Sequence, residues 1–288
     1  MSGPLDRIAA RIRENVRKKP DGDIDVPAER ETFESMGKIC QPFVGVSVET
    51  RDVGGVSCDI ITPKEHERRV VYFHGGAFCL GAPRGYRNWL THLANATRAE
   101  LVVPDYRLAP EHPFPAATDD AFAVWQAANA NVMMGDSAGA NLTLATTLRA
   151  GAEGAKSPES IVLISPWIDL DHTGETLKTN ADEDPIVREG DSRAHAKLYF
   201  GEHSSRDPRI SPLFAELRGL PPVYVQVGKD EALLDDARRF EIRAREAGVD
   251  VKTDLFDGVF HVWHFCAGVA PESDDAIARI GAFLTRSL

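Results

Sequence analysis

The sequence predicts an α/β protein with a mostly parallel sheet and helices on both of its faces. Five short runs are apolar throughout instead of alternating, as expected of parallel strands that are buried on both sides. Helical stretches separate these runs, and that alternation is typical of a parallel sheet covered by helices. The apolar runs are 70–73, 101–103, 132–134, 161–164 and 223–227. The helical stretches are 84–98, 116–128, 138–152 and 232–247.

The two ends of the chain extend this pattern. We expect residues 1–43 to be mostly helical, with a break near the Pro-Asp-Gly at 20–22 and a first helix that packs on the protein. Residues 44–50 alternate and predict a half-buried strand, which a Gly-Gly turn joins to 56–62 in an antiparallel hairpin. A strand over 252–256 and a helix over 273–287 are predicted to end the chain.

The interval 171–210 interrupts the regular order. It is rich in charge and contains one predicted helix near 190–200. We therefore interpret it as an insertion between two strands, suited to a cap. The predicted division is an N-terminal helical cap segment at 1–43, an α/β core at 44–170 and 206–288, and a cap insertion at 171–205.

The composition of the 288 residues is that of an ordinary globular protein, with 43% hydrophobic and 27% charged residues. A net charge of −11 argues against a nucleic-acid surface. The four cysteines form no Cys-x-x-Cys pair, so neither a thiolate zinc site nor a disulfide scaffold is expected. Without a secretory h-region or a run of about 20 apolar residues, we expect a cytoplasmic protein with no stable membrane anchor.

One stretch carries the strongest chemical signal. Gly135-Asp136-Ser137-Ala138-Gly139 follows an apolar strand and opens a helix, the context of a nucleophile elbow. A β-carbon at either glycine would meet the neighbouring strand or helix. The bare pentapeptide is also common in polar turns, so the prediction depends on partners elsewhere.

Those partners follow other predicted strands. Gly75 and Gly76 come directly after the strand at 70–73, where their backbone N–H groups, with that of Ala138, can bind an oxyanion. His74 is interpreted as a structural loop residue. The alternative is a plain glycine turn.

Candidates for the acid and the base follow the last two predicted strands. Asp230 is the preferred acid, with Glu231, Asp235 and Asp236 as competitors. His261 is the preferred base, with His264 three residues later as its rival. The chain order Ser137, Asp230, His261 is that of an α/β-hydrolase, in which the histidine activates the serine and an acyl-enzyme forms.

Four motifs together resemble the bacterial hormone-sensitive-lipase-like esterases. They are His74-Gly75-Gly76-Ala77-Phe78, Asp105-Tyr106-Arg107-Leu108-Ala109-Pro110-Glu111, Gly135-Asp136-Ser137-Ala138-Gly139 and Ser165-Pro166-Trp167. The resemblance spans about residues 44–267 and implies an eight-stranded α/β-hydrolase fold with a helical cap. It also implies hydrolysis of short- to medium-chain acyl esters without a cofactor or metal. The same triad and oxyanion residues match by motif.

The resemblance leaves several points open. Candidate pocket residues are Phe78, Trp167 and Phe214, and the substrate is a small acyl ester or a lactone. A lactone hydrolase, a deacetylase, a peptidase and a non-catalytic small-molecule receptor are the alternatives, and a homodimer is a family-level expectation. The stretch from Trp125 to Asn131 is shorter than expected, which predicts a shortened helix or a tight loop before the elbow.

Overall fold

The computed structural model describes residues 3–16 and 18–286, and these form an eight-stranded sheet. The strand order is β1-β2-β4-β3-β5-β6-β7-β8. β2 is antiparallel to both β1 and β4, and the remaining neighbours are parallel. The strands are β1 (Ser47–Val53), β2 (Val56–Thr62), β3 (Arg68–Phe73), β4 (Ala99–Pro104), β5 (Val132–Asp136), β6 (Ser160–Ile164), β7 (Val223–Gly228) and β8 (Val251–Phe256). The predicted fold class is confirmed.

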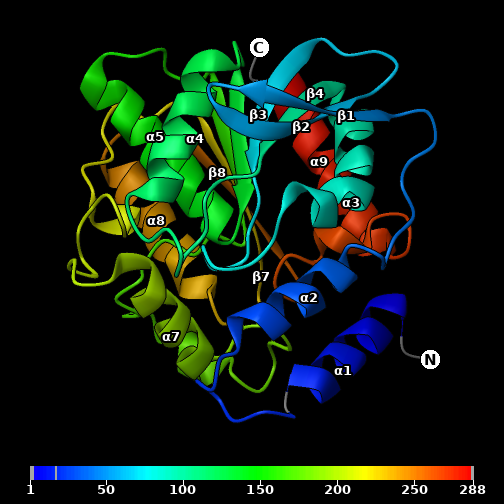
Figure 1. The fold of residues 1–288 in the computed structure, drawn as a ribbon, viewed down its shortest axis with the longest axis vertical. Coiled ribbons are helices and arrows are strands. Elements are labelled where there is room, and N and C mark those ends of the chain that lie inside the picture. Colours follow the sequence, from blue (N-terminus) through cyan, green and yellow to red (C-terminus); the bar gives the residue numbers. More distant parts are fainter. Residues whose placement is uncertain (1–2, 17, 287–288) are drawn as a thin grey trace.

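Helices cover both faces of the sheet (Figure 1). Alternate side chains of the strands enter two separate apolar clusters: Phe73 and Met133 enter one, and Tyr72 and Met134 the other. The first cluster packs under α4, α5 and α8, and the second under α3 and α9. The longer helices are α1 (Pro4–Val16), α2 (Val26–Met36), α3 (Pro83–Thr97), α4 (Ala116–Ala127), α5 (Ala138–Glu153), α7 (Glu189–Phe200), α8 (Leu234–Glu246) and α9 (Pro271–Arg286). Short helical turns are α6 (Thr176–Thr179), η1 (Pro212–Phe214) and η2 (Trp263–Cys266). Residue 287, the predicted end of the last helix, lies outside the described residues.

Strand β1 departs from its prediction. The expected half-buried strand begins three residues late, and its side chains are exposed almost throughout. Val44 lies before the strand and is 91% exposed. β1 is at the edge of the sheet and pairs only with β2, so its alternation does not correspond to a buried face.

The short connection before β5 is a tight loop. α4 ends at Ala127, and Asn129 adopts a left-handed conformation with φ 49°. The N–H of Asn131 then donates to the carbonyl oxygen of Arg69 at 2.9 Å, which aligns the chain with β3. The left-handed conformation of Asn129 therefore lets a short loop join α4 to β5.

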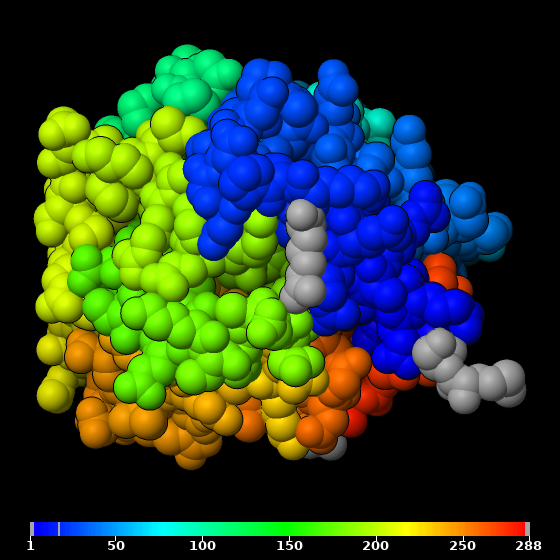
Figure 2. Space-filling view, turned by 90° about the horizontal axis from the view of Figure 1, so that it is seen from below, coloured from blue at the N-terminus to red at the C-terminus, as the bar shows by residue number. Residues whose placement is uncertain are grey.

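The N-terminal helices and the 171–210 interval lie side by side on one face of the molecule (Figure 2, blue beside green to yellow). α1 packs its apolar side on the protein through the buried Leu5. α7 contacts the loop after β3, where the rings of Tyr199 and Phe78 stack with centroids 3.7 Å apart. Within the described residues, none of the helices has the length and apolarity that crossing a membrane requires.

Candidate active site

Ser137 lies in a tight turn between β5 and α5. Its φ of 52° and ψ of −118° form a conformation that residues other than glycine rarely adopt. The flanking glycines permit the turn: a Cβ at Gly139 would collide with the carbonyl of Phe73, and one at Gly135 with the carbonyl of Gly139. The Ser137 N–H donates to the carbonyl oxygen of Ile164 at 2.9 Å, so the end of β6 helps to hold the serine in place.

Glu231 is the carboxylate that contacts His261. Its Oε2 lies 3.0 Å from Nδ1 of His261, and its side chain is fully buried. Its Oε1 accepts from the N–H of Gly228 at 2.6 Å and from the hydroxyl of Ser165 at 2.8 Å. Because a carboxylate only accepts hydrogen bonds, Nδ1 of His261 carries the hydrogen and Nε2 keeps its lone pair.

Asp230, the acid preferred from the sequence, is exposed instead. After β7 ends, the chain makes a turn that is closed by a hydrogen bond from the Glu231 N–H to the carbonyl of Gly228 at 3.3 Å. This turn carries Lys229 and Asp230 to the surface and places the side chain of Glu231 in the interior. The expected contact between Asp230 and His261 is therefore wrong by one residue.

The two other acidic candidates bind backbone N–H groups, one in the 171–210 interval and one in the loop after β6. Asp235 accepts from the N–H of Glu175 at 2.8 Å, and Asp236 accepts from the N–H of Ile168 at 2.8 Å. Both carboxylates therefore fix loops next to the site. No three His, Cys, Asp or Glu side chains of residues 3–16 and 18–286 converge as metal ligands.

Three histidines near the strand ends differ in their electrostatic environment. Burial disfavours the charged form of His261, but the hydrogen bond and the charge of Glu231 outweigh it and raise the pKa of His261. His264, the rival base, is bound through Nε2 to Oε1 of Gln226 at 2.8 Å, and burial lowers its pKa to about 3. Burial also lowers the pKa of His74 to about 4. Of these three described side chains, only His261 has a carboxylate partner.

The loop after β3 is anchored by the residue before the serine. The N–H of Gly75 lies 3.1 Å from Oδ1 of Asp136 and 2.9 Å from the hydroxyl oxygen of Tyr86. Asp136 also accepts from the hydroxyls of Tyr72 and Tyr86, at 2.8 and 2.9 Å. The N–H of Gly75 is therefore occupied, and its expected role as an oxyanion donor is wrong.

Other backbone N–H groups remain available beside it. Those of Gly76, Ala77 and Ala138 make no hydrogen bond to another described residue. Gly76 and Ala77 have positive φ values of 114° and 53° in the turn after β3. The N–H of Ala138 belongs to the first turn of α5, where no intrahelical acceptor exists. The loop and the helix thus supply donors of the kind that stabilise an oxyanion.

A cluster of aromatic side chains adjoins the backbone of Ser137. The N–H of Trp167 donates to the Ser137 carbonyl at 3.2 Å, and its ring centroid lies 5.9 Å from that of Phe78. Tyr199 of α7 stacks on Phe78; it lies within the helix predicted near 190–200 but is not among the predicted pocket residues. Phe214 lies on η1 beneath the guanidinium of Arg206, and no ring contact among the described residues joins it to the other aromatic side chains.

Comparisons with known proteins agree with this architecture. A family described as the alpha/beta hydrolase fold matches residues 70–265. The chain is 39% identical to a protein named "Esterase" from Acinetobacter venetianus, over 75% of this chain and 74% of that protein. It is 36% identical to an "Acetyl-hydrolase" from Streptomyces hygroscopicus, over 81% and 80% of the two chains.

Solved structures extend the similarity to the whole chain. An esterase from the bacterial hormone-sensitive lipase family superimposes with a TM-score of 0.94 and 38% identity, covering 100% of this chain and 99% of that one. EstE5, in a crystal soaked with p-nitrophenyl butyrate, gives a TM-score of 0.92 and 31% identity, covering 100% and 99% of the two chains. The chain therefore belongs to the bacterial hormone-sensitive-lipase-like family of ester hydrolases with the α/β-hydrolase fold.

Proposed function

We propose that the protein is a serine carboxylesterase in which Ser137, His261 and Glu231 act together. The observation that carries this proposal is the buried hydrogen bond between His261 and Glu231. Ser165 supports this pair, because its hydroxyl donates to Glu231 and accepts from the N–H of Val262 at 3.1 Å. The residue before it, Ile164, accepts from the N–H of Ser137 at 2.9 Å. Ser137, Glu231 and His261 follow β5, β7 and β8, whose carboxyl ends lie at the same edge of the sheet, and this supports the proposal that the three side chains act together.

The mechanism follows from the hydrogen positions. Nε2 of His261 takes the proton of the Ser137 hydroxyl as its oxygen attacks the carbonyl carbon of the ester. The developing oxyanion accepts from the N–H groups of Gly76 and Ala138, with Ala77 as a further donor. The imidazolium then protonates the leaving alcohol, and a water activated by His261 hydrolyses the acyl-enzyme.

The surroundings of Ser137 favour short- to medium-chain acyl groups. Ser137 is only 9% exposed, and the ring of Phe78 stacks on Tyr199 and contacts Trp167, whose N–H binds the carbonyl of Ser137. We propose that residues 1–43 and 171–205 act as a cap over the α/β core and set this limit. A lactone hydrolase or a deacetylase on the same triad is the alternative, which the name of the Streptomyces relative favours for small acyl groups.

A substrate panel tests the proposal. We expect turnover of p-nitrophenyl esters from acetate to octanoate, with a maximum at a short chain, and no turnover by Ser137→Ala. A higher kcat/KM for lactones or acetylated alcohols would select the alternative. Binding of these compounds without turnover by the unmodified protein would instead identify a receptor on this fold.

Two further properties are proposals. The four cysteines are buried and free, which fits a reducing compartment such as the cytoplasm. A homodimer through the edge strand β8 is a family-level expectation, and sedimentation of the purified protein tests it.

A further inference from the structure

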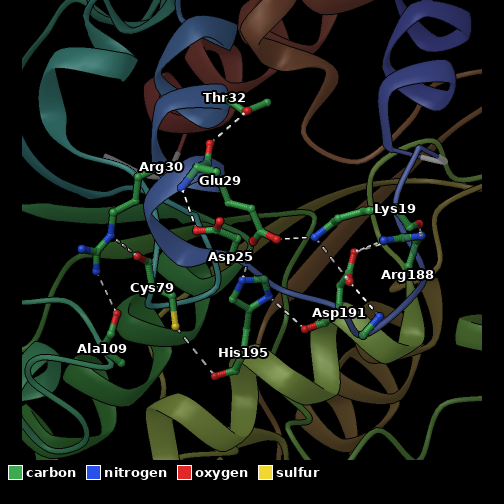
Figure 3. A network of polar contacts seen from close by, with 12 residues as sticks. Lys19, Asp25, Glu29, Arg30, Thr32, Cys79, Ala109, Arg188, Asp191 and His195 are labelled. Carbon is green, nitrogen blue, oxygen red and sulfur yellow. Dashed lines mark hydrogen bonds and ion pairs between the residues drawn. The ribbon is translucent and has the colours of Figure 1, made fainter.

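Arg30 of α2 contacts the turn that carries the proposed oxyanion donors. Its Nε donates to the carbonyl oxygen of Cys79 at 2.8 Å, and its Nη2 donates to the carbonyl oxygen of Ala109 at 3.0 Å. Figure 3 shows the guanidinium of Arg30 extending from α2 to the carbonyls of Cys79 and Ala109. One side chain thus connects three segments that are far apart in the sequence: α2, the turn after β3 and the proline-rich loop after β4.

That turn requires support because its backbone is strained. Ala77 and Phe78 have φ values of 53° and 61°, a region that residues other than glycine adopt only at an energetic cost. Inside the turn, the N–H groups of Cys79 and Leu80 both donate to the carbonyl of Gly76, at 3.0 and 2.7 Å. These bonds close the turn on itself, but they do not fix its position relative to Ser137.

Contacts from outside fix that position. The carbonyl of Phe78 accepts from the N–H of Ala109 at 2.9 Å, and the next carbonyl, that of Cys79, accepts from Arg30. Successive carbonyl groups of the turn are therefore held by the proline-rich loop and by α2. Both contacts lie immediately after Gly76 and Ala77, whose N–H groups the mechanism uses.

Glu111 orients the guanidinium of Arg30. Its two carboxylate oxygens each accept from one terminal nitrogen of Arg30, both at 2.7 Å, in a bidentate pair. This hydrogen bonding lowers the pKa of Glu111 to about 2, so the carboxylate stays charged at neutral pH. Glu111 belongs to the motif after β4 that resembles the family but has no assigned role in the mechanism. Its geometry connects that motif to the oxyanion turn.

We propose that Arg30, oriented by Glu111, is a positioning residue for the oxyanion hole. This inference rests on the proposed function, because it concerns the donors that the mechanism assigns. Arg30 acts through the carbonyl of Cys79 and does not touch the substrate. Since the oxyanion exists only after attack, the loss of Arg30 reduces kcat and leaves KM nearly unchanged.

The test compares Arg30→Ala and Arg30→Lys with Glu34→Gln as a matched control. Glu34 lies on the same helix and pairs with Arg84 of α3, but it does not contact the turn. With p-nitrophenyl butyrate we expect Arg30→Ala to reduce kcat roughly 10- to 100-fold, with KM within about threefold. An alkyl trifluoromethyl ketone, which forms a tetrahedral oxyanion on the serine, loses affinity by a similar factor. The kcat of Arg30→Lys should lie between those of Arg30→Ala and the unmodified protein, and Glu34→Gln should retain activity within about twofold.

Each result decides the inference. A kcat for folded Arg30→Ala or Arg30→Lys equal to that of Glu34→Gln overturns it, and so does a loss that lies entirely in KM. If Arg30→Ala does not fold, Arg30→Lys and Glu111→Gln decide by the same two readouts, with an expected loss of roughly threefold or more in kcat. Failure of the proposed function is a separate result: it appears as turnover by Ser137→Ala, whatever the Arg30 variants do.

Discussion

The strand-end site and the contact between the N-terminal helices and α7 are built from different interactions. At the strand ends, the carboxyl groups of Asp136 and Glu231 are buried, and each accepts several hydrogen bonds from neighbouring elements. Between residues 19–29 and α7, polar side-chain pairs make the contact, and Lys19, Glu29 and Asp191 in them are partly exposed. These pairs include Glu29 with Lys19 and with His195, and Lys19 with Asp191.

This difference suggests different roles for the two regions: the strand ends hold the proposed catalytic groups, and the contact with α7 can open more easily. Partly exposed ion pairs contribute little to stability and weaken with salt, whereas buried and fully bonded carboxylates are strongly coupled to the fold. We therefore expect α2 and α7 to separate at a lower free-energy cost than the strand-end loops. Such a separation would leave the hydrogen bonds of Asp136 and Glu231 unchanged.

The largest expected effect comes from Ser137→Ala, which removes the proposed nucleophile and leaves the contact between the N-terminal helices and α7 unchanged. We expect kcat to fall by roughly 10⁵- to 10⁶-fold, because the residues of a triad act as a unit. The thermal midpoint stays close to that of the unmodified protein. A large drop in that midpoint would show that the two regions are not separable.

The next effect distinguishes two neighbouring acids. Glu231→Gln replaces the carboxylate beside His261 by a neutral amide and should reduce kcat by roughly 10³- to 10⁴-fold. Asp230→Asn is the matched control at an exposed position, and we expect its activity to remain within about twofold of the unmodified protein. Equal losses in the two variants, or a larger loss in Asp230→Asn, would contradict the proposed role of Glu231.

The pH dependence is a smaller effect that belongs to the strand ends alone. Only neutral His261 acts as a base, so kcat/KM falls about tenfold per pH unit below its pKa. Because Glu231 raises that pKa, the fall in kcat/KM on the acidic side begins above the usual histidine pKa of about 6.5. In Glu231→Gln, kcat/KM of any residual activity should begin to fall at a lower pH. If the fall begins at the same pH, a group other than His261 titrates.

The smallest effect concerns the contact between the N-terminal helices and α7. Glu29→Gln weakens the pairing with His195 and Lys19, and we expect the thermal midpoint to fall by about 2–4 °C at neutral pH. Despite the burial of Glu29, its hydrogen bonds to His195 and Lys19 lower its pKa from 4.5 to about 2. The stabilisation is therefore present above pH 4.5 and is lost as the pH falls towards 2. Melting curves of both proteins across this range check the sign, and a constant difference would contradict it.

The sequence predicted what backbone geometry controls. Apolar runs specify buried parallel strands, and the glycines around Ser137 are required because a side chain would collide with the backbone. Both features are local, so they can be read from a single chain. The chain order of the candidate nucleophile and histidine also follows from them.

The features that the sequence did not predict depend on side-chain direction or on distant segments. Asp230 and Glu231 are adjacent acids, and only the turn that begins at Gly228 decides which one faces the interior. The N–H of Gly75 is occupied because Tyr86 and Asp136, from other elements, converge on it. These contacts cannot be inferred from residue type and spacing.

The most direct test of the central claim is the site of covalent labelling. After reaction with an alkyl organophosphonate, we predict one adduct per chain, located on Ser137 by peptide mass analysis. Labelling should slow strongly in Glu231→Gln and remain fast in Asp230→Asn. An unlabelled but folded and esterolytic protein, or an adduct on another residue, would contradict the proposal that Ser137 is the nucleophile activated by His261 and Glu231.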